Sequence, residues 1–185
     1  MLENFDIAVI GGGIAGVSVA ARLSKHAKIG LWEQEDSLAY HSSSRSAAVF
    51  ISDYGNSDVC ELNLITFHEL QSKYPDILQK RGLMSLDKDG KTEEFKSHSK
   101  SLGLSPISVD EAKDKAPIID INTVKQAAWR DDVFDMDTDL LIQTLRKECI
   151  NNGVQIFTNS SINSLESTNN KWFLNSKIQS DILIN

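Results

Sequence analysis

Cysteine is scarce in this chain, and so are clusters of positive charge. The 185 residues include two cysteines, Cys60 and Cys149, which lie far apart in the sequence and lack the spacing of metal ligands. We therefore expect no disulfide framework and a reducing, cytoplasmic location. Acidic residues outnumber basic ones by 26 to 19, which gives a net charge of −7, and Lys and Arg form no run. This balance argues against nucleic acid and anionic membranes as partners.

The sequence also lacks a hydrophobic run long enough to cross a membrane. The longest apolar stretch, residues 7–21, is interrupted by three consecutive glycines and follows Glu3 and Asp6 rather than basic residues. A transmembrane helix needs about 20 apolar residues, and a signal peptide begins with positive charge. We interpret this stretch as a buried strand followed by a helix.

Histidine and acidic residues form no cluster typical of hydrolases or metal enzymes. Adjacent acids such as Asp131 and Asp132 are interpreted as solvated faces or helix caps. We expect no metal site, because the four histidines are scattered along the chain: His26, His41, His68 and His98. The hydrophobic fraction of 41% and the charged fraction of 24% are those of a globular protein.

The clearest pattern that is present lies at the N-terminus. Residues 5–10 (FDIAVI) form a short apolar run, typical of a parallel strand that is covered on both faces. The apolar spacing after the glycines predicts a helix that ends near His26, and residues 28–33 (KIGLWE) predict a second strand. Together they form a β-α-β unit with a right-handed crossover, so the sheet should be parallel.

The glycine spacing Gly11-x-Gly13-x-x-Gly16 lies between that strand and that helix. In this context the first glycine permits a tight turn, the second lets a pyrophosphate approach the backbone, and the third lets the helix pack closely. The phosphates then meet the positive end of the helix dipole. Glu33 follows about 20 residues on, where a carboxylate accepts hydrogen bonds from ribose and disfavours NADP. The pattern does not separate NAD from FAD.

The rest of the chain predicts mixed helices and strands. Residues 36–56 are interpreted as an ordered loop with one helical turn near residues 46–50. Ser108 or Asp110 is expected to cap one helix, and Asp137 or Thr138 another. Helices are predicted at 57–73, 92–103, 108–117 and 139–152, and strands at 82–87, 124–130, 153–159, 161–167, 171–176 and 181–185.

A second motif narrows the choice of nucleotide. Residues 40–48 (YHSSSRSAA), with the following Tyr54-Gly55 step, resemble the FAD-dependent amine and amino-acid oxidoreductases of the D-amino-acid oxidase superfamily. The resemblance is closest to the branch of D-arginine dehydrogenase and its relatives. It continues, more weakly, through residues 81–87 (RGLMSLD), 129–141 (WRDDVFDMDTDLL) and 181–185 (DILIN). FAD is therefore the implied cofactor.

The resemblance also implies which residues form the site. Tyr54 would lie over the substrate side of the flavin, and the backbone of Ile162 would contact adenine. The small side chains of Ala47 and Ala48 would let the flat isoalloxazine ring lie against the backbone. The implied cofactor contacts are Gly11, Gly13, Ala15, Gly16, Glu33, Gln34, Ser42, Ser43, Ser44, Arg45, Ser46, Ala47, Ala48 and Ile162.

These residues have plainer interpretations when the resemblance is set aside. Residues 42–48 are then a serine-rich surface loop. Ile162 is a core isoleucine, and Tyr54 is a surface tyrosine before a turn glycine. The residue types at these positions suit a cofactor contact and a plain structural role equally well. Only the family resemblance therefore favours the cofactor roles.

Several positions depart from the family pattern. Gly30 interrupts the second strand, and Ala27 replaces the glycine that usually ends the first helix. Val49 stands where D-arginine dehydrogenases have a histidine beside the flavin, and residues 81–87 begin without the acid that would bind a guanidinium. These departures argue against arginine as the substrate. Oxidation of some other amine or amino acid remains the expected reaction.

The implied fold is α/β, with a Rossmann-like FAD-binding β-α-β sheet that carries an inserted α+β substrate domain. Residues 1–56 would form the first part of the FAD-binding domain and residues 57–131 part of the substrate domain. Residues 132–185 would return to the FAD-binding domain, which is incomplete at its C-terminus. We expect a fragment of this kind to be inactive on its own.

The implied reaction is oxidation of the C–N bond of an amine or amino acid. Hydride transfer to flavin N5 would give an imine and then a 2-oxo acid plus ammonia, with an electron acceptor as a further partner. One alternative is an NAD-dependent dehydrogenase, in which residues 40–48 would have no role. The other is a non-catalytic dinucleotide-binding fragment, or a subunit that needs a partner chain.

Overall fold

The computed structural model describes residues 2–185 and divides the chain into two compact units. Unit 1 comprises Met1–Ala47 and Thr138–Asn185, and unit 2 comprises Ala48–Asp137. Unit 2 is thus inserted, in sequence, between the two parts of unit 1. Among the described residues, no helix combines the length and the apolar character that a membrane crossing requires.

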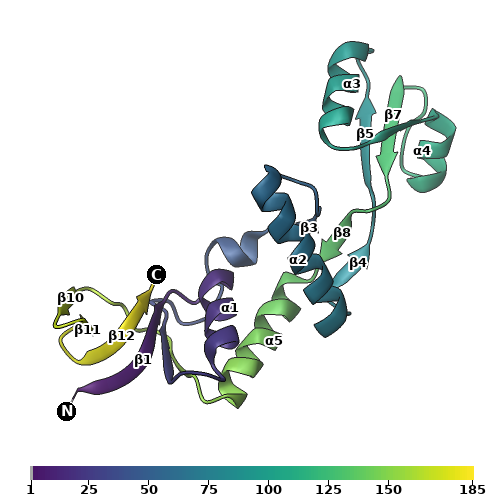
Figure 1. The fold of residues 1–185 in the computed structure, drawn as a ribbon. Helices are drawn as coiled ribbons and strands as arrows, with labels where there is room; N and C mark the ends of the chain where they lie inside the picture. The colour runs from purple at the N-terminus through teal and green to yellow at the C-terminus, as the bar shows by residue number, and fades with distance from the viewer. Residues whose placement is uncertain (1) are drawn as a thin grey trace. The chain divides into compact units, whose positions relative to one another are not determined.

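Unit 1 is built on a six-stranded mixed sheet with the order β10-β11-β12-β1-β2-β9 (Figure 1). Its four neighbouring strands β12, β1, β2 and β9 are parallel, whereas β10 and β11 form an antiparallel hairpin beside them. The α/β class and the parallel sheet are confirmed. The strands are β1 (Glu3–Ile10), β2 (Ile29–Trp32), β9 (Gln155–Phe157), β10 (Leu165–Thr168), β11 (Lys171–Leu174) and β12 (Ile178–Ile184).

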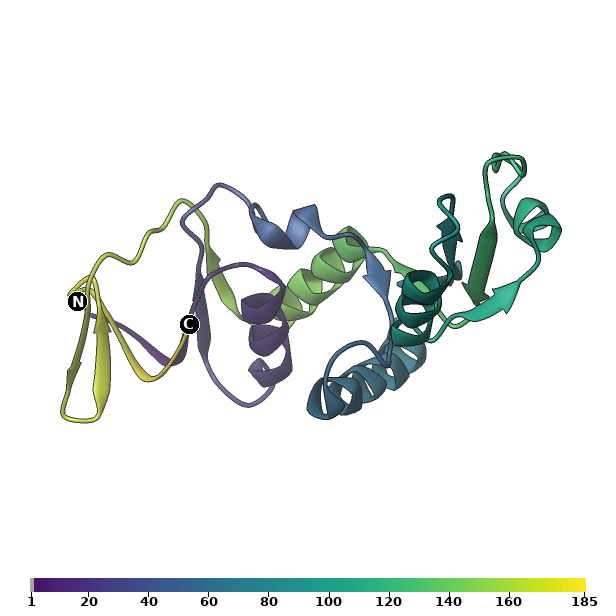
Figure 2. The same cartoon turned by 90° about the horizontal axis from the view of Figure 1, so that it is seen from above.

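Two helices of unit 1, α1 (Ile14–Leu23) and α5 (Thr138–Asn151), lie side by side (Figures 1 and 2). The buried face of α1 consists of small side chains, which allow close approach of the two helices. Cys149 of α5 is completely buried there, and its Sγ lies 3.7 Å from the carbonyl oxygen of Val17. Burial raises the pKa of this thiol to about 11, so Cys149 stays protonated at neutral pH.

Aromatic side chains form the core of the same sheet. The Phe5 ring meets the Trp32 ring edge-on at 5.2 Å, and the Phe157 ring stacks on Trp32 at 5.2 Å. A Cβ on Gly30 would lie 2.2 Å from the Trp32 ring. The expectation that Gly30 interrupts its strand is therefore wrong: β2 is continuous through it, and its missing side chain makes room for the indole.

Unit 2 contains two antiparallel three-stranded sheets. The first, β3-β8-β4, is covered by α2, whose Phe67 ring stacks on Phe50 at 5.8 Å. The second sheet is β5-β7-β6, and the helices α3 and α4 lie beside it (Figure 1). The elements are β3 (Val49–Phe50), α2 (Ser57–Lys73), β4 (Leu78–Lys80), β5 (Leu83–Asp87), α3 (Thr92–Ser101), β6 (Ser105–Ile107), α4 (Val109–Lys115), β7 (Gln126–Arg130) and β8 (Phe134–Met136).

Two local expectations are corrected by the structure. The helical turn near residues 46–50 is instead a 3-10 turn, η1 (Ser42–Arg45), followed by β3. Ala48 takes φ +55°, a left-handed conformation that ends any helix, and Phe50 then pairs with Phe134 of β8. Ile162 lies before β10 rather than inside a strand, because the hairpin begins only at Leu165.

Candidate dinucleotide site

A glycine loop connects β1 to α1 at the carboxyl end of the parallel strands. Gly11 has φ +100°, a conformation that L side chains rarely adopt, and its N–H donates to the Trp32 carbonyl oxygen at 2.8 Å. A Cβ on Gly16 would lie 2.0 Å from the carbonyl oxygen of Gly11. The turn and the close helix packing predicted for these two glycines are therefore confirmed as structural requirements.

The N-terminus of α1 faces the loop that carries η1. Gly13 occupies the N-cap position and offers no side chain to cap the helix. The Ile14 N–H instead donates to Ser43 Oγ at 3.0 Å, and Ala15 lies exposed in the first turn. Amides at a helix N-terminus, together with the helix dipole, attract phosphate oxygens. Ser43 therefore adds a hydroxyl to a position that already favours an anion.

Glu33 lies directly after β2 with only 7% of its surface exposed. Its Oε2 accepts a hydrogen bond from the Gly12 N–H at 2.7 Å, and its Oε1 accepts one from the Glu35 N–H at 3.0 Å. A carboxylate oxygen has two lone pairs, so each oxygen keeps acceptor capacity for a ribose hydroxyl. The buried carboxylate is thus held in one orientation at the edge of the glycine loop.

Gly12 is a residue that the glycine spacing does not single out. A Cβ there would lie 2.4 Å from Leu38 Cδ2 and 3.0 Å from Glu33 Oε2. A side chain at this position would displace the carboxylate from its hydrogen bond. The available signal was the unbroken run of three glycines, in which the middle one is also required.

The predicted flavin segment begins with a well-bonded turn. Ser44 Oγ donates to the His41 carbonyl oxygen at 3.0 Å, and the Ala39 N–H donates to the Gly12 carbonyl oxygen at 2.9 Å. His41 Nε2 lies 2.9 Å from Glu35 Oε1. These bonds join the turn to the glycine loop and to the end of β2. Four other predicted contacts lie exposed in unit 1: Ser42, Arg45, Ser46 and Ala47.

The segment that contains Ile162 runs beside the end of β2. The Ser160 N–H donates to the Glu33 carbonyl oxygen at 2.8 Å, and the Asn159 N–H donates to the Glu35 carbonyl oxygen at 2.7 Å. Ile162 itself is half-buried against the aromatic core of the sheet. Gln34 is exposed, and its Nε2 donates to Glu35 Oε1 at 3.1 Å.

Within unit 1, the structure brings together the glycine loop, Glu33, the η1 turn and the segment before β10. A side-chain-free turn, a helix N-terminus and a buried carboxylate suit the pyrophosphate and ribose of an adenine dinucleotide. The donor set therefore fits FAD. Ala48 and Tyr54 belong to unit 2, where Tyr54 is 66% exposed.

Comparison with known proteins agrees with this geometry. Residues 6–185 match the family described as FAD dependent oxidoreductase. Among solved structures, the chain is similar to L-α-glycerophosphate oxidase from Mycoplasma pneumoniae, which was determined with FAD bound, with a TM-score of 0.80 and 17% identity. It is also similar to glycine oxidase from Geobacillus kaustophilus (TM-score 0.79, 16% identity) and to L-proline dehydrogenase from P. horikoshii (TM-score 0.77, 19% identity).

These alignments cover 98%, 98% and 99% of this chain but only 53%, 54% and 52% of the solved chains, in the same order. The chain thus spans about half the length of these proteins. At such identities the likeness shows the fold alone, whereas the family match extends over nearly all of the sequence. The chain belongs to the FAD-dependent oxidoreductase family, and its cofactor is FAD.

Proposed function

We propose that this chain is the FAD-holding part of an enzyme that oxidises the C–N bond of an amine or amino acid. The observation that carries the cofactor part is Glu33, whose buried carboxylate is bonded to the Gly12 N–H at the carboxyl end of β1 and β2. The motif at residues 40–48 supports the C–N part, through its resemblance to D-arginine dehydrogenase and its relatives. Two similar solved proteins, a glycine oxidase and a proline dehydrogenase, are named for amino-acid substrates.

The proposed roles of the residues come from the glycine spacing and from the family resemblance. Gly11, Gly13, Ala15 and Gly16 hold the pyrophosphate at the N-terminus of α1, and Glu33 binds ribose. Gln34 and Ile162 lie at the adenine end, and residues 42–48 follow the cofactor toward the flavin, where Tyr54 contacts the substrate. When bound, the flavin supplies a hydride acceptor at N5, which leaves an imine that hydrolyses to a 2-oxo acid and ammonia.

The proposal extends to the organisation of the protein. Residues 1–56 and 132–185 are assigned to FAD binding and residues 57–131 to substrate binding. Support comes from the inserted position of unit 2 in the sequence. We further propose a cytoplasmic enzyme that passes electrons to a separate acceptor. Because the chain spans about half of the similar proteins, we propose that it is inactive without further sequence or a partner chain.

The cofactor part is tested by titrating the purified chain with FAD and recording the visible flavin spectrum after desalting. The chain should retain FAD, and Gly13→Val should abolish retention because a branched side chain blocks the phosphates. Ala27→Val, in the turn between α1 and β2, is the matched control and should retain FAD. Tighter binding of NAD than of FAD would instead support a dehydrogenase that uses NAD.

The substrate part is tested by anaerobic bleaching of the flavin band. The panel contains glycine, L-proline, D-arginine, L-arginine and glycerol 3-phosphate, and it is run with the FAD-loaded chain and with the same chain joined to its genomic continuation. Bleaching by an amino acid supports C–N oxidation. If glycerol 3-phosphate alone bleaches the flavin, the proposal of C–N oxidation is wrong and the enzyme oxidises a C–O bond instead.

A further inference from the structure

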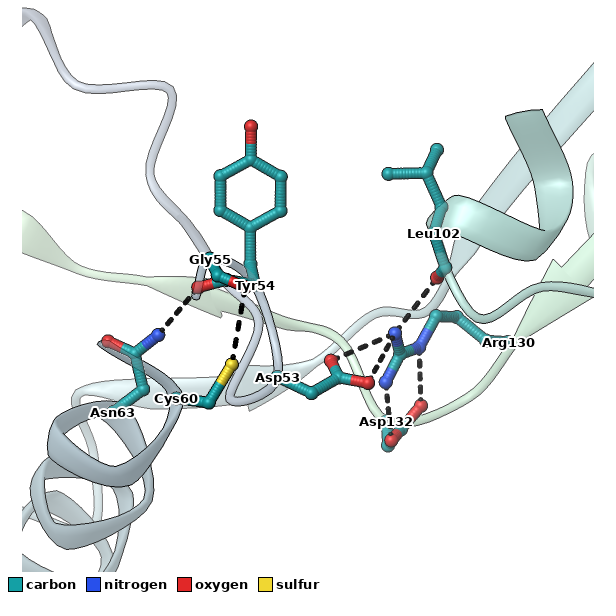
Figure 3. Close-up of polar contacts among 8 residues, drawn as sticks. All are labelled: Asp53, Tyr54, Gly55, Cys60, Asn63, Leu102, Arg130 and Asp132. Atoms are coloured by element: carbon teal, nitrogen blue, oxygen red, sulfur yellow. Dashed lines mark hydrogen bonds and ion pairs between the residues drawn. The ribbon is translucent and has the colours of Figure 1, made fainter. Parts of the chain in front are cut away.

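Arg130, at the end of β7 in unit 2, has a buried guanidinium that contacts three different segments. Its side chain is 8% exposed. Nε and Nη2 donate to the two carboxylate oxygens of Asp132, each at 2.7 Å (Figure 3). Nη1 donates to the Leu102 carbonyl oxygen at 2.9 Å and lies 3.0 Å from Asp53 Oδ1. The arginine therefore joins β7, the end of α3 and the loop that precedes α2.

Asp132 and the Leu102 carbonyl oxygen fix the guanidinium independently of Asp53. The paired bonds to Asp132 set the plane of the guanidinium, since a two-point arginine–carboxylate contact is geometrically specific. Gly103, at φ +65°, lies so close that a Cβ there would be 2.8 Å from Nη1. The hydrogen bonds to Asp132, with the nearby Asp53, raise the pKa of Arg130 and keep it charged. Nη1 is thus a fixed, permanently charged donor toward Asp53.

The loop of residues 51–56 is anchored on its other side to α2. The Tyr54 carbonyl oxygen accepts a hydrogen bond from Asn63 Nδ2 at 3.1 Å, and the Cys60 thiol lies 3.6 Å from the Gly55 carbonyl oxygen. Only backbone atoms of Tyr54 take part in these contacts. Tyr54 as a whole is 66% exposed, and its ring points away from both anchors (Figure 3). The loop is therefore held on two sides while one aromatic side chain is left free.

We propose that Arg130 is a positioning residue for Tyr54, which it places through the side chain of Asp53. The proposal rests on the proposed function, in which Tyr54 contacts the substrate. Arg130 orients the loop and does not bind substrate itself, because it is buried and already engaged by two carboxylates. The residue that receives a substrate carboxylate must then lie elsewhere in the enzyme.

The arrangement allows the loop to be released without dismantling the fold. Asp53 is 58% exposed, whereas the Arg130–Asp132 pair and the Leu102 contact do not involve it. Asp53→Ala removes only the link to the loop. Asp135→Ala is the matched control, because it breaks the Arg81–Asp135 ion pair of 2.7 Å in the same unit, with both side chains about half exposed.

Fluorine NMR of the chain labelled with 3-fluorotyrosine measures the loop directly. The sequence contains three tyrosines, and Tyr54→Phe assigns the resonance of interest. Asp53→Ala should shift and narrow the Tyr54 resonance while those of Tyr40 and Tyr74 stay in place. Asp135→Ala should leave all three unchanged. An unaltered Tyr54 resonance in Asp53→Ala would overturn the proposal.

A second readout separates the positioning role from the substrate role. For the amino acid that bleaches the flavin in the panel above, Asp53→Ala should raise the KM for bleaching several-fold with little change in the limiting rate. Asp53→Glu, which restores the carboxylate, should recover part of the loss. If Tyr54→Phe and Tyr54→Ala both leave KM unchanged, the substrate role of Tyr54 is wrong, while the fluorine spectra still decide whether Arg130 orders the loop.

Discussion

Replacing Gly16 with alanine tests whether the approach of α1 to the glycine loop is as close as the structure requires. The added Cβ would lie 2.0 Å from the Gly11 carbonyl oxygen, whereas ordinary contact begins at 3.4 Å. The helix must therefore retreat by about 1.4 Å, the difference between these values. The obstacle is backbone, so no side-chain rotation relieves it. Overpacking of about 2 kcal/mol should lower Tm by about 4–8 °C in a chain of this size.

Gly13→Ala is the matched control for this prediction. Its Cβ would meet only Ser43 Oγ at 3.2 Å, and the φ of Gly13, −73°, suits any residue. We expect a loss of at most about 1 kcal/mol, from the poorer N-cap, but a clear loss of FAD affinity. Thermal unfolding followed by circular dichroism and FAD titration measure the two effects. If Gly16→Ala melts like the unmodified chain, or Gly13→Ala melts as early as Gly16→Ala, the separation of a packing glycine from a binding glycine is wrong.

Three further predictions concern groups in unit 1. Ser43→Ala removes the acceptor of the Ile14 N–H and should lower the free energy of unfolding by about 0.5–1.5 kcal/mol. This loss should be smaller in melting curves recorded with FAD, because a phosphate oxygen can then accept from the same N–H. Equal losses with and without FAD would contradict the capping role of Ser43. Glu33→Gln puts an amide NH₂ against a backbone N–H in a buried site, which should cost about 1–3 kcal/mol and raise the Kd for FAD in a fluorescence titration. Burial raises the pKa of Cys149 from 9.0 to about 11. The unfolded thiol loses its proton first, so stability is full below pH 9 and falls by about 3 kcal/mol toward pH 11. Cys149→Ala should lack this part of the fall in urea unfolding, and identical pH profiles would contradict it.

Elements with complete local signals follow from the sequence. The apolar spacing predicts a helix over 57–73, and α2 spans those residues. Asn56 caps its start by accepting a hydrogen bond from the Val59 N–H at 3.0 Å, and the Tyr74-Pro75 step ends it. For α4, the choice left open between two caps falls on Ser108, whose side chain forms a capping box with Glu111. The start and the end of these helices are set by residues next to them in the sequence, so their bounds can be predicted without the tertiary structure.

Four strands of unit 2 with two or three residues do not follow from the sequence. β3, β4, β6 and β8 contain two or three residues each, too few to show a period. They exist because partners distant in the chain complete them. Phe50 of β3 pairs with Phe134, and Leu78 of β4 pairs with Met136. No local window contains both members of such a pair.

The candidate site likewise has one part that the sequence predicts and another that it does not. Its glycines and Glu33 are detectable because their spacing reflects the geometry of a ligand. The Ser43–Ile14 bond spans 29 residues and the Arg130–Asp53 bond spans 77. Such contacts depend on how separate segments pack, so a linear motif does not encode them.

The polar groups around the glycine loop satisfy one another within the chain. The Gly12 N–H is bonded to Glu33 and the Ile14 N–H to Ser43, and the Ala39 N–H is bonded to the Gly12 carbonyl oxygen. These bonds join the glycine loop, the end of β2 and the η1 segment into one framework. A dinucleotide that binds there does not have to order three separate loops, which lowers the entropic cost of binding. Because the Glu33–Gly12 bond supports both the fold and the cofactor, its loss should reduce Tm and FAD affinity together.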